Sequence, residues 1–328
     1  MRALLLTEQG PQLHDDYPTP TPQLGEALIR VSLAGICSTD LQLVAGYKGG
    51  YRGILGHEFV GTVVAAPDNE AWIGKRVVGE LNVGCGQCAL CRRGLGKHCR
   101  SRKSLGIIGL NGAFADYLVL PVANLHEVHA LADEIAVFTE PTAAALQICE
   151  QLHIAPSIRV YLLGSGRLGL LVAQALALTG CDLTVIGRTA AKLDLLAGFN
   201  LPLTVHCTVT ADLQPLLAYP ADVVVDVTGS PQGFQLARQL VRPAGTLVLK
   251  STFAGTMPDF DLSALVVDEI TLLGSRCGPF PPAMRLLAQG LIQVEPLIHE
   301  CYGLHDGLMA LQAAAQPGML KVLLTMTH

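Results

Sequence analysis

Four cysteines lie close together in the segment CGQCALCRRGLGKHC and could form a metal site. They are Cys85, Cys88, Cys91 and Cys99, separated by two, two and seven residues. Because this spacing lets a chain wrap around one tetrahedral ion and fill every coordination position, it predicts a structural zinc site. A disulfide or a cluster of free thiols is the alternative, but a reducing compartment disfavours the disulfide.

A second set of metal-binding side chains is divided between two short segments. ICSTDLQ contains Cys37 and Asp40, and GHEFVG contains His57 and Glu58. A single cysteine or histidine is usually structural, but a thiol, an imidazole and a carboxylate together could ligate zinc and leave one position open. Since a catalytic zinc requires an open position, these residues are candidates for a reactive site.

A G-x-G-x-x-G motif suggests a third kind of site, for a dinucleotide. Gly164, Gly166 and Gly169 lie between a strand-like run and a helix-like run, which is the context that the motif requires. The glycines permit a tight turn, a close approach of the backbone to a pyrophosphate, and packing of helix on strand. The predicted cofactor site includes Arg167 and Leu168 of the same loop. A glycine-rich turn without a ligand is the alternative.

The type of dinucleotide is read at the end of the next strand, in the segment VIGRT. An acidic residue there would bind the ribose 2′-hydroxyl of NAD, but this chain has Gly187, Arg188 and Thr189. A guanidinium can pair bidentately with a 2′-phosphate, and Lys192 lies close enough in sequence to assist. The segment therefore predicts NADP(H), with a solvated surface arginine as the alternative.

The elements that must position these residues fall into two parts. Residues up to about 140 form short β-rich pieces rich in glycine and proline, such as EALIRVSLAG and FVGTVVAAP. From Ile158 onward, apolar strands alternate with helix-length segments, beginning with IRVYLLG, SGRLGLLVAQALALTG and CDLTVIG. This alternation predicts a parallel sheet covered on both faces. The last strand-like run, KVLLTM, suggests that the tail returns to the first domain.

Composition limits the classes of protein to which the chain can belong. With 328 residues, half of them apolar, it is long enough for two domains. A net charge of −5 argues against a dedicated nucleic-acid-binding protein. No apolar run has the length of a membrane helix, and the first residues lack the pattern of a signal peptide. We therefore expect a cytoplasmic protein.

Together these motifs resemble those of the zinc-dependent medium-chain dehydrogenase/reductase superfamily, whose best-known members are alcohol dehydrogenases. The cysteine before Thr39–Asp40, the G-H-E, the four-cysteine lobe and the glycine motif occur in the same order. Glu140 in FTEPTAAAL resembles the polyol and threonine dehydrogenase branch, in which glutamate is the third zinc ligand. The resemblance implies an α/β fold with a discontinuous β-rich GroES-like catalytic domain, residues 1–145 and 277–328. A Rossmann domain with a doubly wound parallel sheet, residues 146–276, lies between them.

The resemblance also implies a role for each candidate residue. Cys37, His57 and Glu140 would hold the catalytic zinc, with Glu58 as a possible exchanging ligand. Asp40 would accept a hydrogen bond from the His57 imidazole and fix its tautomer.

Proton transfer involves two further residues. Thr39 would accept the alcohol proton through its hydroxyl. Many relatives carry a histidine at the position of Gln42, and glutamine does not titrate near neutral pH. We therefore expect the proton to leave through water or through the cofactor ribose.

The sequence thus predicts an enzyme that uses zinc and NADP(H) to transfer a hydride to or from a small-molecule alcohol or carbonyl compound. The resemblance implies a homodimer or homotetramer. An NAD-linked polyol or sugar dehydrogenase and a non-catalytic NADPH-binding sensor on the same fold are the alternatives. The cysteine lobe is basic and could contact nucleic acid, although a solvated charge run is commoner. Its basic residues are Arg92, Arg93, Lys97, Arg100, Arg102 and Lys103.

Overall fold

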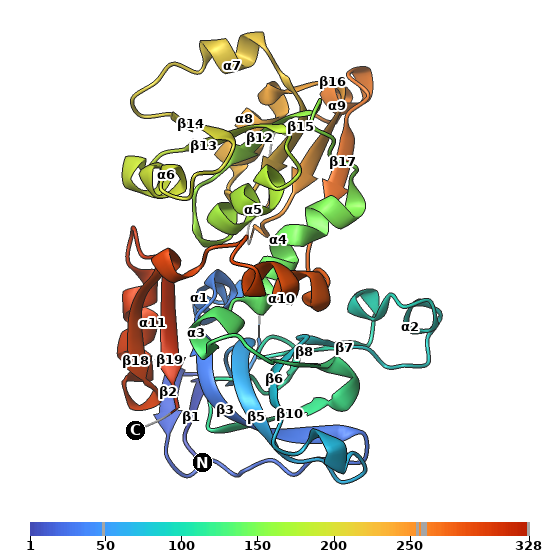
Figure 1. Cartoon of the computed structure of the whole chain (residues 1–328), viewed down its shortest axis with the longest axis vertical. Coiled ribbons are helices and arrows are strands. Elements are labelled where there is room, and N and C mark those ends of the chain that lie inside the picture. The colour runs from blue at the N-terminus through green and yellow to red at the C-terminus, as the bar shows by residue number, and fades with distance from the viewer. Residues whose placement is uncertain (48–49, 254–255, 257–260, 327–328) are drawn as a thin grey trace. The chain divides into compact units, whose positions relative to one another are not determined.

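The computed structural model describes residues 1–47, 50–253, 256 and 261–326. Contacts within the chain separate two compact units (Figure 1). Unit 1 comprises Met1–Glu140, Phe280–Gln289 and Val294–His328, and unit 2 comprises Pro141–Pro279 and Gly290–Gln293. Within the described ranges, we find no helix with the length and apolar character needed to span a membrane.

Unit 2 is built on a parallel sheet of six strands in the order β14-β13-β12-β15-β16-β17. The strands are β12 (Arg159–Leu163), β13 (Asp182–Gly187), β14 (Leu203–Cys207), β15 (Ala221–Asp226), β16 (Val241–Leu249) and β17 (Thr271–Gly274). In chain order this is the 3-2-1-4-5-6 arrangement of a doubly wound dinucleotide-binding fold. The predicted parallel sheet is therefore confirmed.

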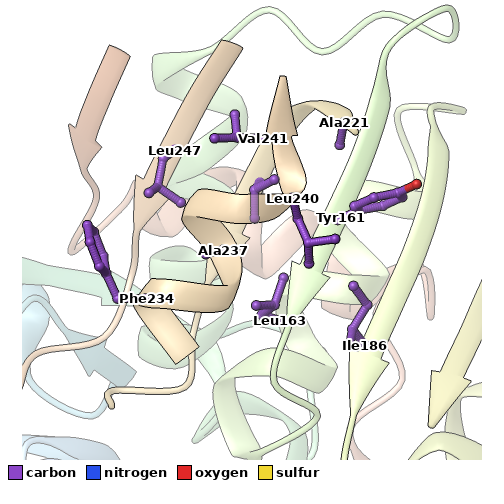
Figure 2. Packing of buried hydrophobic residues seen from close by; sticks show 10 residues of the cluster. Tyr161, Leu163, Ile186, Ala221, Phe234, Ala237, Leu240, Val241 and Leu247 are labelled. Carbon is purple, nitrogen blue, oxygen red and sulfur yellow. The ribbon is translucent and has the colours of Figure 1, made fainter. Parts of the chain in front are cut away.

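Helices cover this sheet, and one of them illustrates how sequence produces the packing. The helices of this region are α4 (Thr139–Gln151), α5 (Arg167–Ala177), α6 (Ala190–Ala197), α7 (Gln214–Ala218), α8 (Pro231–Leu240) and α9 (Leu262–Val267). Ser230 caps α8 by accepting a hydrogen bond from the backbone of Gly233. Phe234, Ala237 and Leu240 recur every three residues, so they share one face and lie in a buried cluster with the sheet (Figure 2).

Unit 1 contains the β-rich part of the chain, as predicted. Its largest sheet has the order β11-β6-β5-β3-β19-β18, with β10 paired to β3, and two three-stranded sheets have the orders β2-β1-β4 and β7-β8-β9. The strands up to residue 140 are β1 (Ala3–Thr7), β2 (Gly10–His14), β3 (Glu26–Gly35), β4 (Gly53–Ile54), β5 (Glu58–Ala65), β6 (Arg76–Gly79), β7 (Asn82–Val83), β8 (Lys103–Leu105), β9 (Gly109–Leu110), β10 (Tyr117–Pro121) and β11 (Leu125–Glu127). The short helices there are α1 (Ser38–Val44), α2 (Ala89–Arg92) and α3 (Asp133–Ala136).

The C-terminal segment completes the largest sheet of unit 1. It contributes α10 (Phe280–Ala288), β18 (Ile298–Gly303), α11 (Gly307–Ala315) and β19 (Lys321–Thr325). Strand β19 pairs antiparallel with β3, so the last strand of the chain lies beside a central strand of the first domain. The Arg2 guanidinium reinforces this closure, since it pairs with Asp116 and donates to the backbone oxygen of Met326.

Candidate functional site

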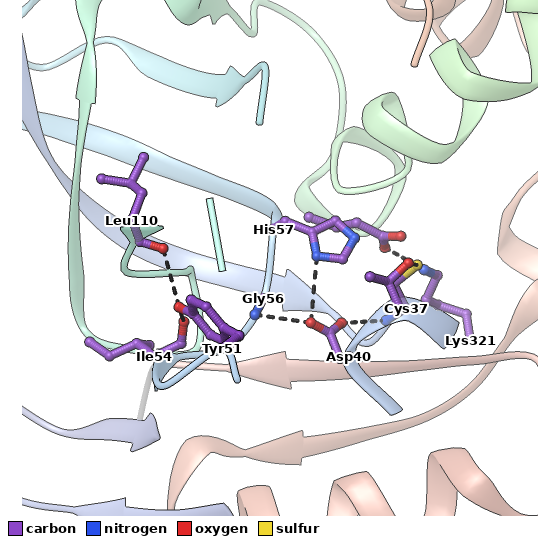
Figure 3. Close-up of polar contacts among 10 residues, drawn as sticks. Cys37, Asp40, Tyr51, Ile54, Gly56, His57, Leu110 and Lys321 are labelled. Carbon is purple, nitrogen blue, oxygen red and sulfur yellow. Dashed lines mark hydrogen bonds and ion pairs between the residues drawn. The ribbon is translucent and has the colours of Figure 1, made fainter. Parts of the chain in front are cut away.

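A buried carboxylate joins the two segments that carry Cys37 and His57. Asp40 is fully buried and lies in the first turn of α1, where its Oδ2 accepts a hydrogen bond from the backbone N–H of Cys37 at 2.8 Å. Its Oδ1 accepts from the backbone N–H of Gly56 at 3.1 Å (Figure 3). Because one side chain binds the backbone beside both residues, Asp40 fixes the spacing between the thiol and the imidazole.

His57 is oriented by the same carboxylate. Its ring is 3% exposed, and Nδ1 lies 3.5 Å from Asp40 Oδ1. Burial by itself would lower the pKa of His57, but the Asp40 carboxylate and the Cys37 thiol raise this pKa well above its usual value. With Nδ1 turned toward Asp40, Nε2 is the nitrogen left to bind a metal.

The donor atoms of Cys37, His57 and Glu58 form a compact group. One ligand atom from each of the three lies within 4.8 Å of the others. Their chemistry fits zinc, because thiolate, imidazole and carboxylate are its three common protein ligands at bond lengths of about 2.0–2.3 Å. Three protein donors leave room for a substrate oxygen or a further ligand.

The other candidates near this group are distributed as follows. The Thr39 hydroxyl lies 3.8 Å from Cys37 Sγ, so these two residues are neighbours at the start of α1. Gln42 lies one turn later on the same helix, and its side chain is half-buried. Glu140 is the second residue of α4 and is half-buried, but it is not part of the Cys37–His57–Glu58 group among the described residues.

The four cysteines of the lobe converge on one point, with ligand atoms within 4.8 Å of one another. Cys85 and Cys91 have their sulfur atoms 4.0 Å apart, and Cys88 and Cys99 have theirs 3.8 Å apart. A disulfide bond is about 2.05 Å long, whereas a tetrahedral ion with Zn–S bonds of about 2.3 Å separates its sulfur ligands by about 3.8 Å. The four thiols are free, and their spacing fits a tetrahedral ion.

Local backbone geometry supports metal binding in the lobe. The backbone N–H groups of Gln87 and Cys88 lower the pKa of the Cys85 thiol to about 6. The backbone N–H of Cys91 likewise lowers the pKa of Cys88, which caps α2. Because the thiolate is the form that binds a metal, these donors favour metal binding by Cys85 and Cys88. Burial and the neighbouring Cys88 thiol raise the pKa of Cys91 to about 11, so Cys91 would lose its proton only when a metal binds.

The glycine loop has the geometry that the motif predicts. Gly164 follows β12 with φ of +107°, a conformation that side chains disfavour. A Cβ at Gly169 would lie 2.0 Å from the backbone oxygen of Gly164, so α5 approaches the strand too closely for any side chain there. A Cβ at Gly166, by contrast, would have no neighbour within 4 Å.

These two glycines offer a matched pair of substitutions. We expect Gly169→Ala to lower the free energy of unfolding by about 1–3 kcal/mol, because the added methyl group forces α5 away from the strand. Gly166→Ala should lower it by only about 0.5 kcal/mol, since the methyl group enters open space and only the preference for glycine over alanine at this N-cap is lost. Chemical denaturation of both variants measures the difference. Equal stabilities would contradict the close approach of α5 to Gly164.

At the end of β13, Gly187 is required by packing against the glycine loop. A Cβ at this position would lie 2.5 Å from Ser165 Oγ. Arg188 and Thr189 follow Gly187 and are exposed. Lys192 is half-buried on α6. The pKa of its ammonium group is lowered, mainly by burial and secondly by the nearby Arg167 guanidinium. Two neighbouring cations beside the glycine loop are suited to binding an anion.

Two buried side chains beside these sites are absent from the residues predicted above. Ser165 is 6% exposed and contacts Gly187, and Lys321 is 5% exposed and pairs with Glu58. Serine within the glycine motif could have been noticed from its position. Lys321 had no such signal, because 263 residues separate it from its partner.

Comparison with known proteins supports this description of the two units. Residues 23–130 match the family model of the alcohol dehydrogenase GroES-like domain, and residues 168–289 match that of the zinc-binding dehydrogenases. The chain is 30% identical over 345 residues to an L-threonine 3-dehydrogenase of Streptomyces avermitilis, and the match covers 100% of both chains. The chain belongs to the zinc-type medium-chain alcohol dehydrogenase family. Its predicted family and fold class are thereby confirmed.

Other proteins similar to this medium-chain dehydrogenase include a polyol dehydrogenase and two dehydrogenases whose structures were solved with a bound cofactor. An erythritol/L-threitol dehydrogenase of Mycolicibacterium smegmatis is 31% identical, with 86% of this chain and 85% of the relative covered. A zinc-binding dehydrogenase of Sinorhizobium meliloti, solved with NADP, has a TM-score of 0.89 at 26% identity, covering 99% and 98% of the two chains. An alcohol dehydrogenase of Escherichia coli, solved with NADH, has a TM-score of 0.90 at 27% identity, covering 99% of each chain.

Proposed function

We propose that this medium-chain dehydrogenase is a zinc- and NADP(H)-dependent oxidoreductase of alcohols, polyols or their carbonyl products. The observation that supports the zinc proposal is the buried group of Cys37, His57 and Glu58, whose donor atoms lie within 4.8 Å of one another. A zinc ion bound there would supply Lewis acidity toward an alcohol or carbonyl oxygen. The proposed ligands are Cys37, His57 and Glu140, the last by analogy with the polyol and threonine dehydrogenase branch, and Glu58 is the proposed exchanging ligand.

The surrounding residues have proposed roles in positioning and proton transfer. Asp40 fixes the position of the His57 imidazole relative to the backbone of Cys37, because its carboxylate contacts both. Thr39 would accept the alcohol proton through its hydroxyl. Because Gln42 cannot serve as a base, the proton would then pass to water or to the ribose of a bound cofactor.

We propose a second, structural zinc ion at Cys85, Cys88, Cys91 and Cys99. The sulfur separations of 3.8 and 4.0 Å support it. With four thiolates the ion has no open position, so it contributes to the stability of the lobe and not to the reaction.

Unit 2 is the proposed NADP(H) site. Gly164, Gly166 and Gly169, with Arg167 and Leu168 between them, form the loop at the N-terminus of α5 that would receive the pyrophosphate. The residues proposed to surround the 2′-phosphate are Gly187, Arg188, Thr189 and Lys192. No carboxylate follows β13 directly, which supports the phosphorylated cofactor.

The preference for NADP(H) can be tested at Arg188. We expect Arg188→Ala to raise the dissociation constant of NADPH by roughly 10–100-fold, because a charged hydrogen-bonded pair with the 2′-phosphate is lost. The dissociation constant of NADH should not change. Fluorescence titration with both cofactors measures this, with Arg93→Ala as a control for loss of an exposed arginine. Tighter binding of NADH than of NADPH by the unaltered protein would refute the preference.

NAD-linked oxidation of polyols is the second candidate function. Polyols are supported by relatives named as polyol dehydrogenases, such as the D-arabinitol dehydrogenase 1 of Uromyces fabae, which is 29% identical over 311 residues. NAD is supported by the Escherichia coli relative that was solved with NADH. Turnover assays with NADP and NAD, each with a series of polyols and simple alcohols, distinguish the two candidates. We also propose a cytoplasmic homodimer or homotetramer whose partner is a small-molecule substrate and not a nucleic acid or a membrane.

A further inference from the structure

A buried ion pair links the proposed catalytic group to the last strand of unit 1. Lys321, the first residue of β19, is 5% exposed and donates from Nζ to Oε2 of Glu58, which is 1% exposed (Figure 3). The same ammonium group lies 5.2 Å from the centre of the Phe138 ring. Lys321 is therefore held between a carboxylate and an aromatic face, away from solvent.

The strand order explains how two distant residues meet. Strand β3 lies between β5 and β19, and Gly35 at its end pairs with Glu58 on one side and Leu323 on the other. A Cβ at Gly35 would lie 2.6 Å from Glu58 Oε2 and 3.4 Å from Lys321 Nζ. The φ angle of Gly35 is not positive, so other residues could adopt this backbone conformation. Glycine is required here because a side chain would collide with the Glu58 carboxylate and the Lys321 ammonium group.

The Glu58 carboxylate thus faces two partners. It lies within 4.8 Å of the donor atoms of Cys37 and His57, and it also forms the ion pair with Lys321. A buried carboxylate needs compensating positive charge, and a bound metal ion would be the largest charge in the site. Any strengthening of one of these interactions weakens the other.

We propose that Lys321 is a positioning residue that competes with the catalytic metal for Glu58. By holding this carboxylate, Lys321 keeps Glu58 as a reserve ligand and leaves a coordination position open for the substrate oxygen. The inference rests on the proposed function, because it requires a metal at Cys37 and His57. It assigns a role in ligand exchange to a residue at the opposite end of the chain.

Substitution of Co²⁺ for the catalytic metal tests this without an activity assay. Visible absorption of Co²⁺ weakens when a fifth ligand joins four, so it reports the coordination number. We expect Lys321→Met to weaken this absorption and to lower the dissociation constant of the metal by about 10–100-fold, the usual scale for residues behind a metal ligand. The dissociation constant should fall, and not rise, because the Lys321 ammonium group repels the metal ion and holds Glu58, and the variant lacks this group. Lys321→Arg should keep the original spectrum.

Lys250→Met is the matched control. Lys250 is also buried, at 7% exposed, and donates to Ser275 Oγ and to the backbone oxygen of Arg276 in unit 2. Its loss should destabilise the fold as removal of a buried lysine does, but it should leave the Co²⁺ spectrum unchanged.

Glu58→Gln keeps the inference testable if Lys321→Met does not fold. The Glu58→Gln variant should have the same Co²⁺ spectrum as the unaltered protein, because Glu58 does not bind the metal while Lys321 holds it. The double variant Glu58→Gln/Lys321→Met should also have that spectrum, because it lacks the carboxylate that would join the metal. An unchanged spectrum in Lys321→Met, or a changed one in Glu58→Gln, would overturn the inference alone. If Cys37→Ser has the same Co²⁺ spectrum as the unaltered protein, the proposed catalytic metal site itself is refuted.

Discussion

Replacing Cys37 with serine is expected to lower turnover by roughly a thousandfold. Lewis-acid stabilisation by a metal contributes several kcal/mol, and about 4 kcal/mol corresponds to that factor. The fold should survive, because Cys37 is the N-cap residue of α1 and serine is favoured at that position. The zinc content should fall by one ion per chain while the affinity for NADPH stays constant. Metal analysis, fluorescence titration and steady-state kinetics measure the three quantities.

A second cysteine separates loss of metal from loss of a thiol. Cys149 is half-buried like Cys37, but it lies on α4 outside both cysteine groups. Cys149→Ser should retain turnover and both metal ions. A Cys37→Ser variant that still turned over at the original rate would show that the thiol does not hold a catalytic metal. A variant that lost NADPH binding as well would indicate that the fold, and not the metal, had failed.

The largest expected effect on stability comes from Cys99→Ser in the four-cysteine lobe. Cys99 is 1% exposed, whereas most of the residues around it are exposed or half-buried. Such a segment has little hydrophobic core of its own, so the proposed structural zinc ion would supply the free energy that folds it. Structural zinc sites in small peptides provide about 10–16 kcal/mol of apparent binding free energy. We expect Cys99→Ser to lose the structural ion and the lobe to unfold locally.

Trypsin provides a direct measurement, because the lobe contains Arg92, Arg93 and Lys97. Rapid cleavage within the lobe of Cys99→Ser, with the rest of the chain protected, is the expected result. Cys181→Ser is the control for loss of a buried thiol, since Cys181 is 4% exposed and its Sγ donates to the backbone oxygen of Leu176. Resistance of Cys99→Ser to trypsin, with the zinc content unchanged, would contradict the structural metal site.

The elements with strong periodicity were predictable from sequence alone. The run EALIRVSLAG became β3 with the same bounds, and IRVYLLG and CDLTVIG became β12 and β13. Strand β14, Leu203–Cys207, was not predicted, because its apolar residues alternate with polar ones and so differ from the continuous apolar runs of the neighbouring strands. It lies at the edge of the sheet, where it is half-exposed. Helix α4, Thr139–Gln151, was not predicted either, because Pro141 near its start obscures the helical pattern.

The sequence by itself was sufficient to predict the candidate sites whose residues are close together in the chain. The cysteine lobe and the glycine motif are short-range features, and a fixed spacing between residues is sufficient to bring their atoms together. Only the tertiary structure decided which residues share the buried group at Cys37. Strand pairing brings Lys321 over Gly35 to Glu58, and Asp40 joins the segments of Cys37 and Gly56. Such contacts depend on the order of strands in a sheet, which no local spacing of residues encodes.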